Sequence, residues 1–312
     1  MASVSDAVRV VTPAKINLIL RVLDRRSDGY HNIWSIMHTV GLMDELIIRQ
    51  SSAPQITLHC DHAGLPTDRA NLVVRAASAV MECTGRRQGL EISLKKRIPV
   101  GAGLGGGSSD AAATIAGLNR LFGLGWSQAE MSQVGAGLGS DVPFFFYGPT
   151  AQVSGRGERV GPLRLNGERW AVLVNPGFPV ETRWAYEQLA ARRGTPTPLS
   201  KAHEALRARE VCRWDDVIPL MENDFESALA PMHPVFGELK AALLRVGAQA
   251  ALLSGSGSAV FGLFTDEAMA QHAMERLKAS GHTILAVQAG TLLTVASARG
   301  DDPIVSSVAR LG

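Results

Sequence analysis

The sequence predicts an α+β protein with two domains. A chain of 312 residues is long for a single compact core. Stretches typical of strands and of helices follow one another without strict alternation, and this mixture favours the α+β class. We place the crossing between the domains at residues 162–170, which gives a first domain of residues 1–165 and a second domain of residues 166–312.

The chain opens with a predicted strand. Residues 8–22 are rich in β-branched and apolar residues and carry no helical stripe. Because strand side chains alternate, Lys15 and Asn17 point to the same face. A turn-rich segment follows at 24–31. Beyond it the pattern predicts, in order, strands at 47–49 and 55–59, a helix at 70–83 and a strand at 90–99.

A helix is predicted at 108–122, since Ser108, Ser109 and Asp110 are residue types that cap helix starts. The remaining elements mix both types. In order, they are a helix at 128–138, a strand at 170–175, a helix at 234–246, two strands flanking a glycine-rich loop within 250–264, a helix at 267–279 and a last strand at 283–289.

Composition and charge argue against several kinds of partner. The chain is 46% hydrophobic and 19% charged, with a net charge of +2 and no run of five like charges, so neither nucleic acid nor a membrane is expected. No apolar stretch reaches the ~18 residues that span a bilayer, and no leader pattern opens the chain. The three cysteines form no CxxC pair, and we expect a reducing cytoplasm.

The most informative segment is a glycine-rich loop with five glycines in seven residues. Without Cβ atoms, a backbone can adopt positive φ angles and approach a ligand closely. The predicted helix behind the loop presents unpaired N–H groups and the positive end of its dipole. The combination indicates a site for the phosphates of a nucleotide. Its residues are Pro99, Val100, Gly101, Ala102, Gly103, Leu104, Gly105, Gly106, Gly107, Ser108 and Ser109.

Two familiar nucleotide motifs do not fit this loop. It contains GxGxxG, but a dinucleotide fold requires an acidic residue at the end of a second strand ~20 residues later, and the following segment is helical. No Gly-Lys-Ser/Thr follows either, so the lysine of a P-loop is missing. The loop is therefore predicted to bind phosphate in a third way.

Three motifs in order carry a family resemblance. They are PAKINL at 13–18, PVGAGLGGGSSDAA at 99–112 and LLSGSGSAVF at 252–261. Over about residues 8–290 the chain resembles the GHMP kinase superfamily, which includes galactokinase, homoserine kinase, mevalonate kinase and phosphomevalonate kinase. The segments RSDGYH at 26–31, GSDVPFF at 139–145 and ENDFE at 222–226 make it most similar to members that phosphorylate a cytidine diphosphate-linked methylerythritol.

The resemblance implies a two-domain α+β, GHMP kinase-like fold with the active site in the cleft between the domains. It implies ATP bound on the glycine-rich loop, a small-molecule substrate, and a monomer or a homodimer. Mg²⁺ is expected to bridge the phosphates. Ser108, Ser109 or Asp110 could reach the metal or could simply cap the helix, so its ligands stay unassigned.

In this family the lysine of PAKINL and the aspartate of SDVPFF are catalytic, which implies Lys15 and Asp141 here. The chemistry agrees, because phosphoryl transfer needs charge stabilisation and a group that accepts the hydroxyl proton. A lysine beside the aspartate keeps the carboxylate ionised. Taken alone, Asp141 could equally be a helix cap, and Lys15 could be a solvated strand residue.

The substrate end is implied by further matching positions. Tyr30 and His31 match positions that stack on a cytosine and bond its edge, and ordinary packing is the alternative for Tyr30. Thr182 and Tyr186 match a second, closing position, with Phe178 and Trp184 as competitors. Asn17 shares the face of Lys15. The expected substrate-binding residues are Asn17, Tyr30, His31, Thr182 and Tyr186.

Two other functions fit the same fold. One is a different GHMP kinase, such as a homoserine or phosphomevalonate kinase, although an aromatic residue beside an imidazole suits a nucleobase. The other is an inactive nucleotide sensor that binds a partner. The presence of both Lys15 and Asp141 argues against a sensor, because binding alone requires neither residue.

Overall fold

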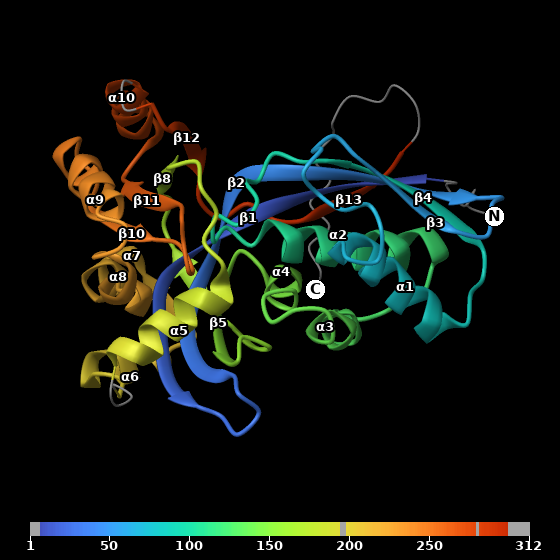
Figure 1. Ribbon diagram of the computed structural model, residues 1–312, viewed down its shortest axis with the longest axis horizontal. Coiled ribbons are helices and arrows are strands. Elements are labelled where there is room, and N and C mark those ends of the chain that lie inside the picture. The colour runs from blue at the N-terminus through green and yellow to red at the C-terminus, as the bar shows by residue number, and fades with distance from the viewer. Residues whose placement is uncertain (1–6, 194–197, 279–280, 299–312) are drawn as a thin grey trace.

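The computed structural model describes residues 7–193, 198–278 and 281–298. Two long antiparallel strands, β1 (Ala7–Arg25) and β2 (His31–Ser51), run through the molecule and form its frame (Figure 1). The prediction found β1 but only the end of β2. Residues 33–40 are all buried, because this part of the hairpin is covered on both faces, and so the polar alternation that marks a strand is missing.

Seven strands make up the first sheet of the described chain. Its order is β13-β1-β2-β4-β3, with β5 paired to β2 and β6 paired to β5. The β3–β4 pair is parallel, and the other pairs are antiparallel. The bounds are β3 (Ile56–Cys60), β4 (Gly89–Lys95), β5 (Thr150–Gly155), β6 (Arg159–Pro162) and β13 (Thr294–Ser297).

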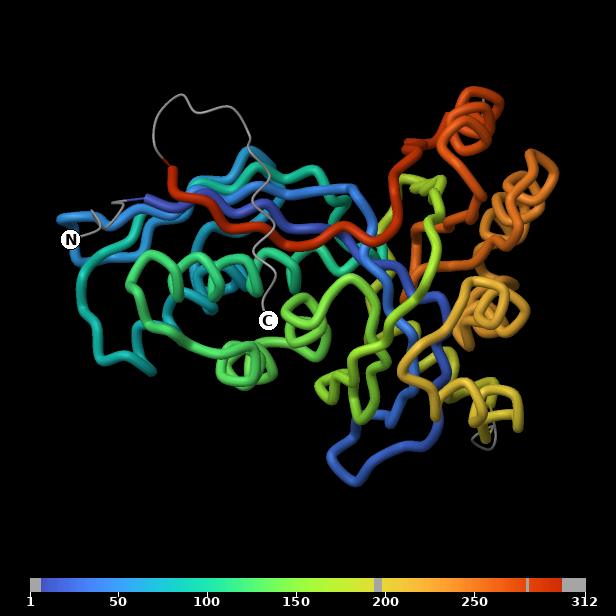
Figure 2. Tube along the Cα trace, turned by 180° about the vertical axis from the view of Figure 1, so that it is seen from behind, coloured from blue at the N-terminus to red at the C-terminus, as the bar shows by residue number. Residues whose placement is uncertain are grey.

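Strand β13 was not predicted, and it changes the division of the chain. Its register pairs Val8 with Ser297, and Figure 2 shows this segment running back along β1. Residues 294–297 of the predicted second domain thus belong to the first sheet. The last residues of the range 166–312 lie outside the described chain. We propose a boundary near residue 165, with the segment at 294–297 returning to the first domain.

Helices cover one face of the first sheet (Figure 1). Helix α2 packs close to it, because an added Cβ at Gly117 would lie 2.6 Å from Ile48 Cδ1. A larger residue at this position would force the helix away from the strands. The bounds are α1 (Leu72–Thr84), α2 (Gly106–Phe122), α3 (Gln128–Ala136) and α4 (Phe144–Tyr147).

The second sheet has the order β10-β11-β8-β12 and is antiparallel. Helices α9 and α10 lie on its outer side (Figure 1), while apolar side chains on the inner side, such as Phe261, pack with Ile16 and Ile36 of the long hairpin. The bounds are β8 (Trp170–Asn175), β10 (Ala250–Leu253), β11 (Val260–Phe264), β12 (Thr283–Gln288), α9 (Val235–Arg245) and α10 (Glu267–Leu277).

Smaller elements complete the second half of the chain. A short parallel pair of strands joins the segments before β8 and after α6. The bounds are β7 (Arg164–Asn166), α5 (Thr182–Arg192), α6 (Lys201–Arg207), β9 (Val211–Arg213), α7 (Trp214–Val217), a 3₁₀ turn (Ile218–Leu220) and α8 (Asp224–Leu229). The predicted α+β class is confirmed.

The two glycine-rich loops meet where the domains touch. The Ser254 hydroxyl donates to the Gly103 carbonyl at 3.0 Å, and Ala259 N donates to the Ala102 carbonyl at 3.0 Å. From the other side, Lys15 N donates to the Leu104 carbonyl at 2.9 Å. The first loop is therefore fixed by its own backbone between β1 and the second domain.

We predict that Gly103→Ala lowers the free energy of unfolding more than Gly123→Ala does. Both glycines have positive φ, +75° and +59°, so each new Cβ costs about 1–2 kcal/mol for the left-handed backbone. Nothing lies within 4 Å of a Cβ at Gly123, whereas at Gly103 it would lie 2.0 Å from the Ser254 carbonyl oxygen. Overpacking there adds about 1–3 kcal/mol. Urea denaturation measures both variants, and equal losses would contradict the close loop contact.

Candidate active site

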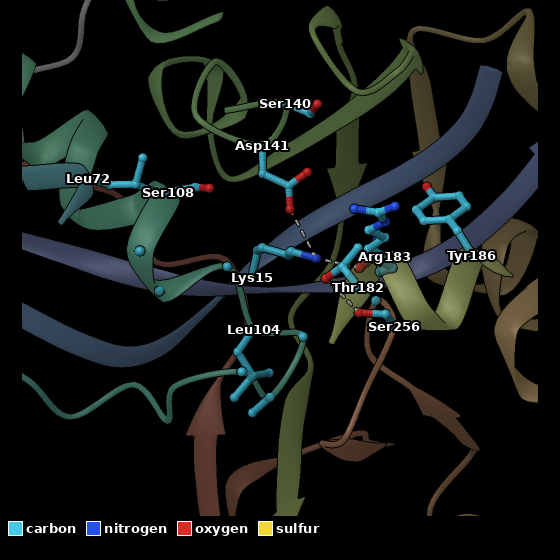
Figure 3. A pocket seen from close by; sticks show the side chains of 18 of the residues that line it. Lys15, Leu72, Leu104, Ser108, Ser140, Asp141, Thr182, Arg183, Tyr186 and Ser256 are labelled. Carbon is cyan, nitrogen blue, oxygen red and sulfur yellow. Dashed lines mark hydrogen bonds and ion pairs between the residues drawn. The ribbon is translucent and has the colours of Figure 1, made fainter. Parts of the chain in front are cut away.

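A cavity of about 1010 Å³ lies along the line where the domains meet. The first glycine-rich loop, β1, the turn before β2, the segment before α4 and helix α5 all contribute to its wall. Figure 3 shows Lys15 and Asp141 facing each other in this space, with Thr182, Arg183 and Tyr186 of α5 beyond them. The cavity thus joins motifs that lie far apart in the sequence.

The phosphate end of the cavity is the glycine-rich loop. Residues 99–108 all line it, as predicted for a nucleotide loop. Helix α2 begins at Gly106, two residues earlier than predicted, and its N-cap residue Gly105 makes no side-chain capping bond. The first N–H groups of α2 are therefore not occupied by a side-chain cap and can bind an anion.

Ser109 is the member of the predicted loop that the structure places elsewhere. Its side chain is fully buried and does not line the cavity. The hydroxyl donates to the Pro13 carbonyl at 2.6 Å and lies 2.6 Å from the Thr12 hydroxyl. Ser109 thus fastens α2 to β1, directly before the strand position of Lys15.

Lys15 and Asp141 are brought together. Lys15 Nζ lies 3.4 Å from Asp141 Oδ2 and donates to Asn17 Oδ1 at 2.7 Å. The lysine side chain is 4% exposed, so it is not a solvated strand residue. Asp141 does not cap α4 either, because the N-cap position is Pro143. Asn17 is held in turn by its Nδ2, which donates to Ser35 Oγ at 2.9 Å.

A second buried lysine, which the sequence did not reveal, lies under the loop. Lys96 Nζ contacts Asp44 and lies 2.9 Å from Asp110 Oδ2. Two carboxylates therefore share one ammonium group. Burial raises the pKa of Asp110 to about 7, and the nearby Asp44 charge adds to the effect while Lys96 opposes it. The lysine pKa is itself raised by the two carboxylates, against the effect of burial.

Aromatic side chains form the other end of the cavity. His31 stacks on Tyr186 with ring centroids 5.0 Å apart, and Tyr30 is 54% exposed beside them. Burial raises the pKa of the Tyr186 phenol. The Thr182 hydroxyl lies 3.1 Å from that of Ser256, in the second glycine-rich loop. Four of the predicted substrate residues, Tyr30, His31, Thr182 and Tyr186, thus line one end, and Asn17 lines the cavity beside Lys15.

The competing aromatic residues lie outside the cavity. Phe178 and Trp184 both pack against His233, with ring centroids 5.1 Å and 5.9 Å away, and neither lines the cavity wall. Tyr186 instead packs edge to face on Phe225, at 4.8 Å. Of the candidates for the second aromatic position, the structure therefore favours Tyr186.

The ENDFE segment holds this end together. Asn223 Nδ2 donates to the carbonyls of Leu253 and Gly255, at 2.8 Å each, and its Oδ1 accepts from Phe225 N at 3.0 Å. The side chain of Asp224 binds the β1 backbone through Val22 N at 2.6 Å. The segment thus fixes the second glycine-rich loop and the support of Tyr186 relative to β1.

Several residues of the wall escaped the sequence analysis. Ser140 and Phe225 stand in the segments GSDVPFF and ENDFE but were given no role there, and the others carry no local motif. Only Asn71, which caps α1 through its side chain, could have been found, as a capping residue type before a helical pattern. The residues missed are Asn71, Leu72, Lys96, Ser140, Arg156, Arg183, Glu187 and Phe225.

The described residues also bear on two other possibilities, a membrane-spanning helix and a metal site. Within the described ranges, no helix has the length and apolar character needed to cross a bilayer. The same ranges contain no cluster of three or more His, Cys, Asp or Glu side chains placed to hold a metal ion.

Known proteins match the chain throughout. The family described as GHMP kinases N terminal domain matches residues 71–149, and the one described as GHMP kinases C terminal matches residues 202–283. A curated 4-diphosphocytidyl-2-C-methyl-D-erythritol kinase of Citrifermentans bemidjiense is 42% identical over 282 residues, which are 90% of this chain and 98% of the relative. The chain belongs to the 4-diphosphocytidyl-2-C-methyl-D-erythritol kinase family of the GHMP kinases.

Solved structures agree with this membership. A crystal structure of 4-(cytidine 5'-diphospho)-2C-methyl-D-erythritol kinase superposes with a TM-score of 0.74 at 35% identity, covering 91% of this chain and 99% of that one. Homoserine kinase from Cytophaga hutchinsonii gives a TM-score of 0.73 at 21% identity, covering 95% and 99%, and shows the fold alone. The resemblance inferred from the motifs is confirmed.

We predict that Asp110→Asn gains stability relative to the original protein as pH rises from 3.8 to about 7. The folded state binds the Asp110 proton more tightly than the unfolded chain does, so the free energy of unfolding of the original protein falls across this window. Asparagine does not titrate, so the free energy of unfolding of the variant does not fall in this way. Urea denaturation at pH 5 and pH 8 without nucleotide measures the difference, and a difference independent of pH would contradict the assignment.

Proposed function

We propose that this protein is an ATP-dependent kinase that phosphorylates the 2-hydroxyl of 4-diphosphocytidyl-2-C-methyl-D-erythritol, a step in the non-mevalonate formation of isoprenoid precursors. Relatives about 41% identical over most of the chain are named for this kinase activity. The observation that carries the proposal is the Lys15–Asp141 pair, 3.4 Å apart, between the glycine-rich loop and the aromatic end of one cavity.

Asp141 is the proposed general base. Its carboxylate accepts the proton of the substrate hydroxyl as the oxygen attacks the γ-phosphorus, while the bond from that phosphorus to the β,γ-bridging oxygen breaks and ADP leaves. Lys15 stabilises the negative charge on the incoming oxygen. Asn17 accepts from Lys15 Nζ and so fixes the ammonium group in front of the carboxylate.

Residues 99–108 are proposed to bind the triphosphate through backbone N–H groups, as anion sites at helix starts do. Mg²⁺ bound beside them would be held by Ser108 and Asp110 together with phosphate oxygens. The Ser108 side chain lines the cavity, and Asp110 Oδ1 is buried with no hydrogen-bond partner among the described residues. When bound, the ion neutralises charge on the transferred phosphoryl group.

The aromatic end is proposed to bind cytidine. Tyr30, His31 and Tyr186 offer flat rings for stacking and an imidazole for the base edge, and Thr182 lies between them and the reaction centre. A nucleobase site of this kind distinguishes the proposal from homoserine kinase activity. The Lys15–Asp141 contact distinguishes it from an inactive sensor.

We also infer a cytoplasmic location. All three cysteines, Cys60, Cys83 and Cys212, are free thiols, as is usual in a reducing compartment.

The test is a coupled assay of ADP release. Turnover is expected with 4-diphosphocytidyl-2-C-methyl-D-erythritol and not with homoserine or phosphomevalonate. Asp141→Asn should lower turnover by at least ~10²-fold and leave ATP affinity nearly intact, because only proton transfer is removed. The control is Asp215→Asn, since Asp215 is 76% exposed and lies outside the cavity wall.

The control should keep full activity. If Asp141→Asn turned over at the original rate, the assignment of Asp141 as general base would be wrong. If the protein phosphorylated homoserine and not the cytidine compound, the proposed substrate would be wrong.

A further inference from the structure

The proposed substrate places a diphosphate between its cytosine and its reacting alcohol. A cavity that binds it should present a cation between the aromatic end and the Lys15–Asp141 pair. Most cations of the wall already have carboxylate partners. Lys96 contacts Asp44 and Asp110, and Arg183 lies 3.1 Å from Glu187. These charges are balanced before any substrate arrives.

Arg156 is different. Its guanidinium donates to the Ala136 carbonyl at 3.3 Å, and no carboxylate lies within ion-pair distance of it among the described residues. The residue is half-buried and lines the cavity. Arg25 also lines the wall without a carboxylate partner in the described ranges, but it is exposed and lies at the end of β1 opposite His31. Partial burial makes the charge of Arg156 the more effective one.

Its location is between the two ends of the cavity. The guanidinium lies 5.3 Å from the centre of the Tyr30 ring, in a cation–π contact. On the other side, the next residue in the chain packs on the catalytic segment, because an added Cβ at Gly157 would lie 3.1 Å from Ser140 Cβ. Arg156 therefore contacts the proposed base-stacking residue, and the residue after it packs on the neighbour of Asp141.

The turn that carries Arg156 is held in place. Arg156 N donates to Glu158 Oε2 at 2.8 Å, and Gly157 N donates to the Ser154 carbonyl at 3.1 Å. These bonds fix the backbone between β5 and β6, so the guanidinium is presented from a defined turn. A group positioned in advance loses less entropy when it binds.

We propose that Arg156 binds the diphosphate of the cytidine diphosphate substrate. The inference rests on the proposed function, because it assumes that the cytidine end lies at Tyr30. A guanidinium presents paired N–H donors that match two phosphate oxygens, and it keeps its charge at all relevant pH values.

The test compares two ligands that differ only in the diphosphate. Cytidine diphosphate is titrated by calorimetry and cytidine by ligand-observed NMR at millimolar concentration, with the original protein and with Arg156→Gln. We expect Arg156→Gln to weaken cytidine diphosphate binding about tenfold or more, in line with a lost charge-assisted contact, and to leave cytidine binding unchanged. The control is Arg159→Gln, at the first residue of β6 directly after the turn, whose side chain is 75% exposed and does not line the cavity.

The outcomes separate the inference from its premise. Equal losses for both ligands would show that Arg156 acts only through Tyr30, and no loss for either would remove it from the site; both results overturn the proposal. Failure of the original protein to bind either ligand would overturn the proposed function itself. Arg159→Gln should bind both ligands normally. If it lost as much affinity for cytidine diphosphate as Arg156→Gln does, the effect would come from the overall positive charge of the protein and not from Arg156.

Discussion

The structure depends on the close approach of two backbones that have no side chains between them. At Gly103 even a methyl group would lie 2.0 Å from the Ser254 carbonyl oxygen, and at Gly105 it would lie 2.8 Å from Lys15 Cγ. The same absence of Cβ atoms brings the second domain and the buried lysine to the start of α2. Domain contact and anion site are therefore two consequences of one constraint, and neither can be changed alone.

Charge is distributed unequally along the cavity, and this distribution gives each part its role. Lys96 is shared by two buried carboxylates, so it fastens the base of the loop and adds little free positive charge. Lys15 faces the partly exposed Asp141, the proposed proton acceptor. The half-buried Arg156 has no carboxylate within ion-pair distance in the described chain and lines the cavity that is proposed to bind the substrate diphosphate.

Local patterns in the sequence predicted a large part of this account. The strand carrying Lys15 and Asn17, the glycine-rich loop with its helix, and the second sheet with α9 and α10 follow from alternation, helical spacing and capping, whereas the elements between β8 and α9 were not predicted. Patterns failed where burial removed them. The first half of β2 is covered on both faces and has no polar alternation. Strand β13 was missed for another reason, since it is short and mostly exposed. Lys96 and Arg156 join the site through tertiary contacts, which no local pattern records.

A crystal structure with a non-hydrolysable ATP analogue and cytidine diphosphate bound together tests the central claim most directly. The account predicts phosphates on the backbone N–H groups of residues 103–108, the γ-phosphate in front of Lys15 and Asp141, and cytosine against Tyr30 and Tyr186 in the same cavity. Polyphosphate bound away from this loop, or two ligands that exclude each other, would contradict it.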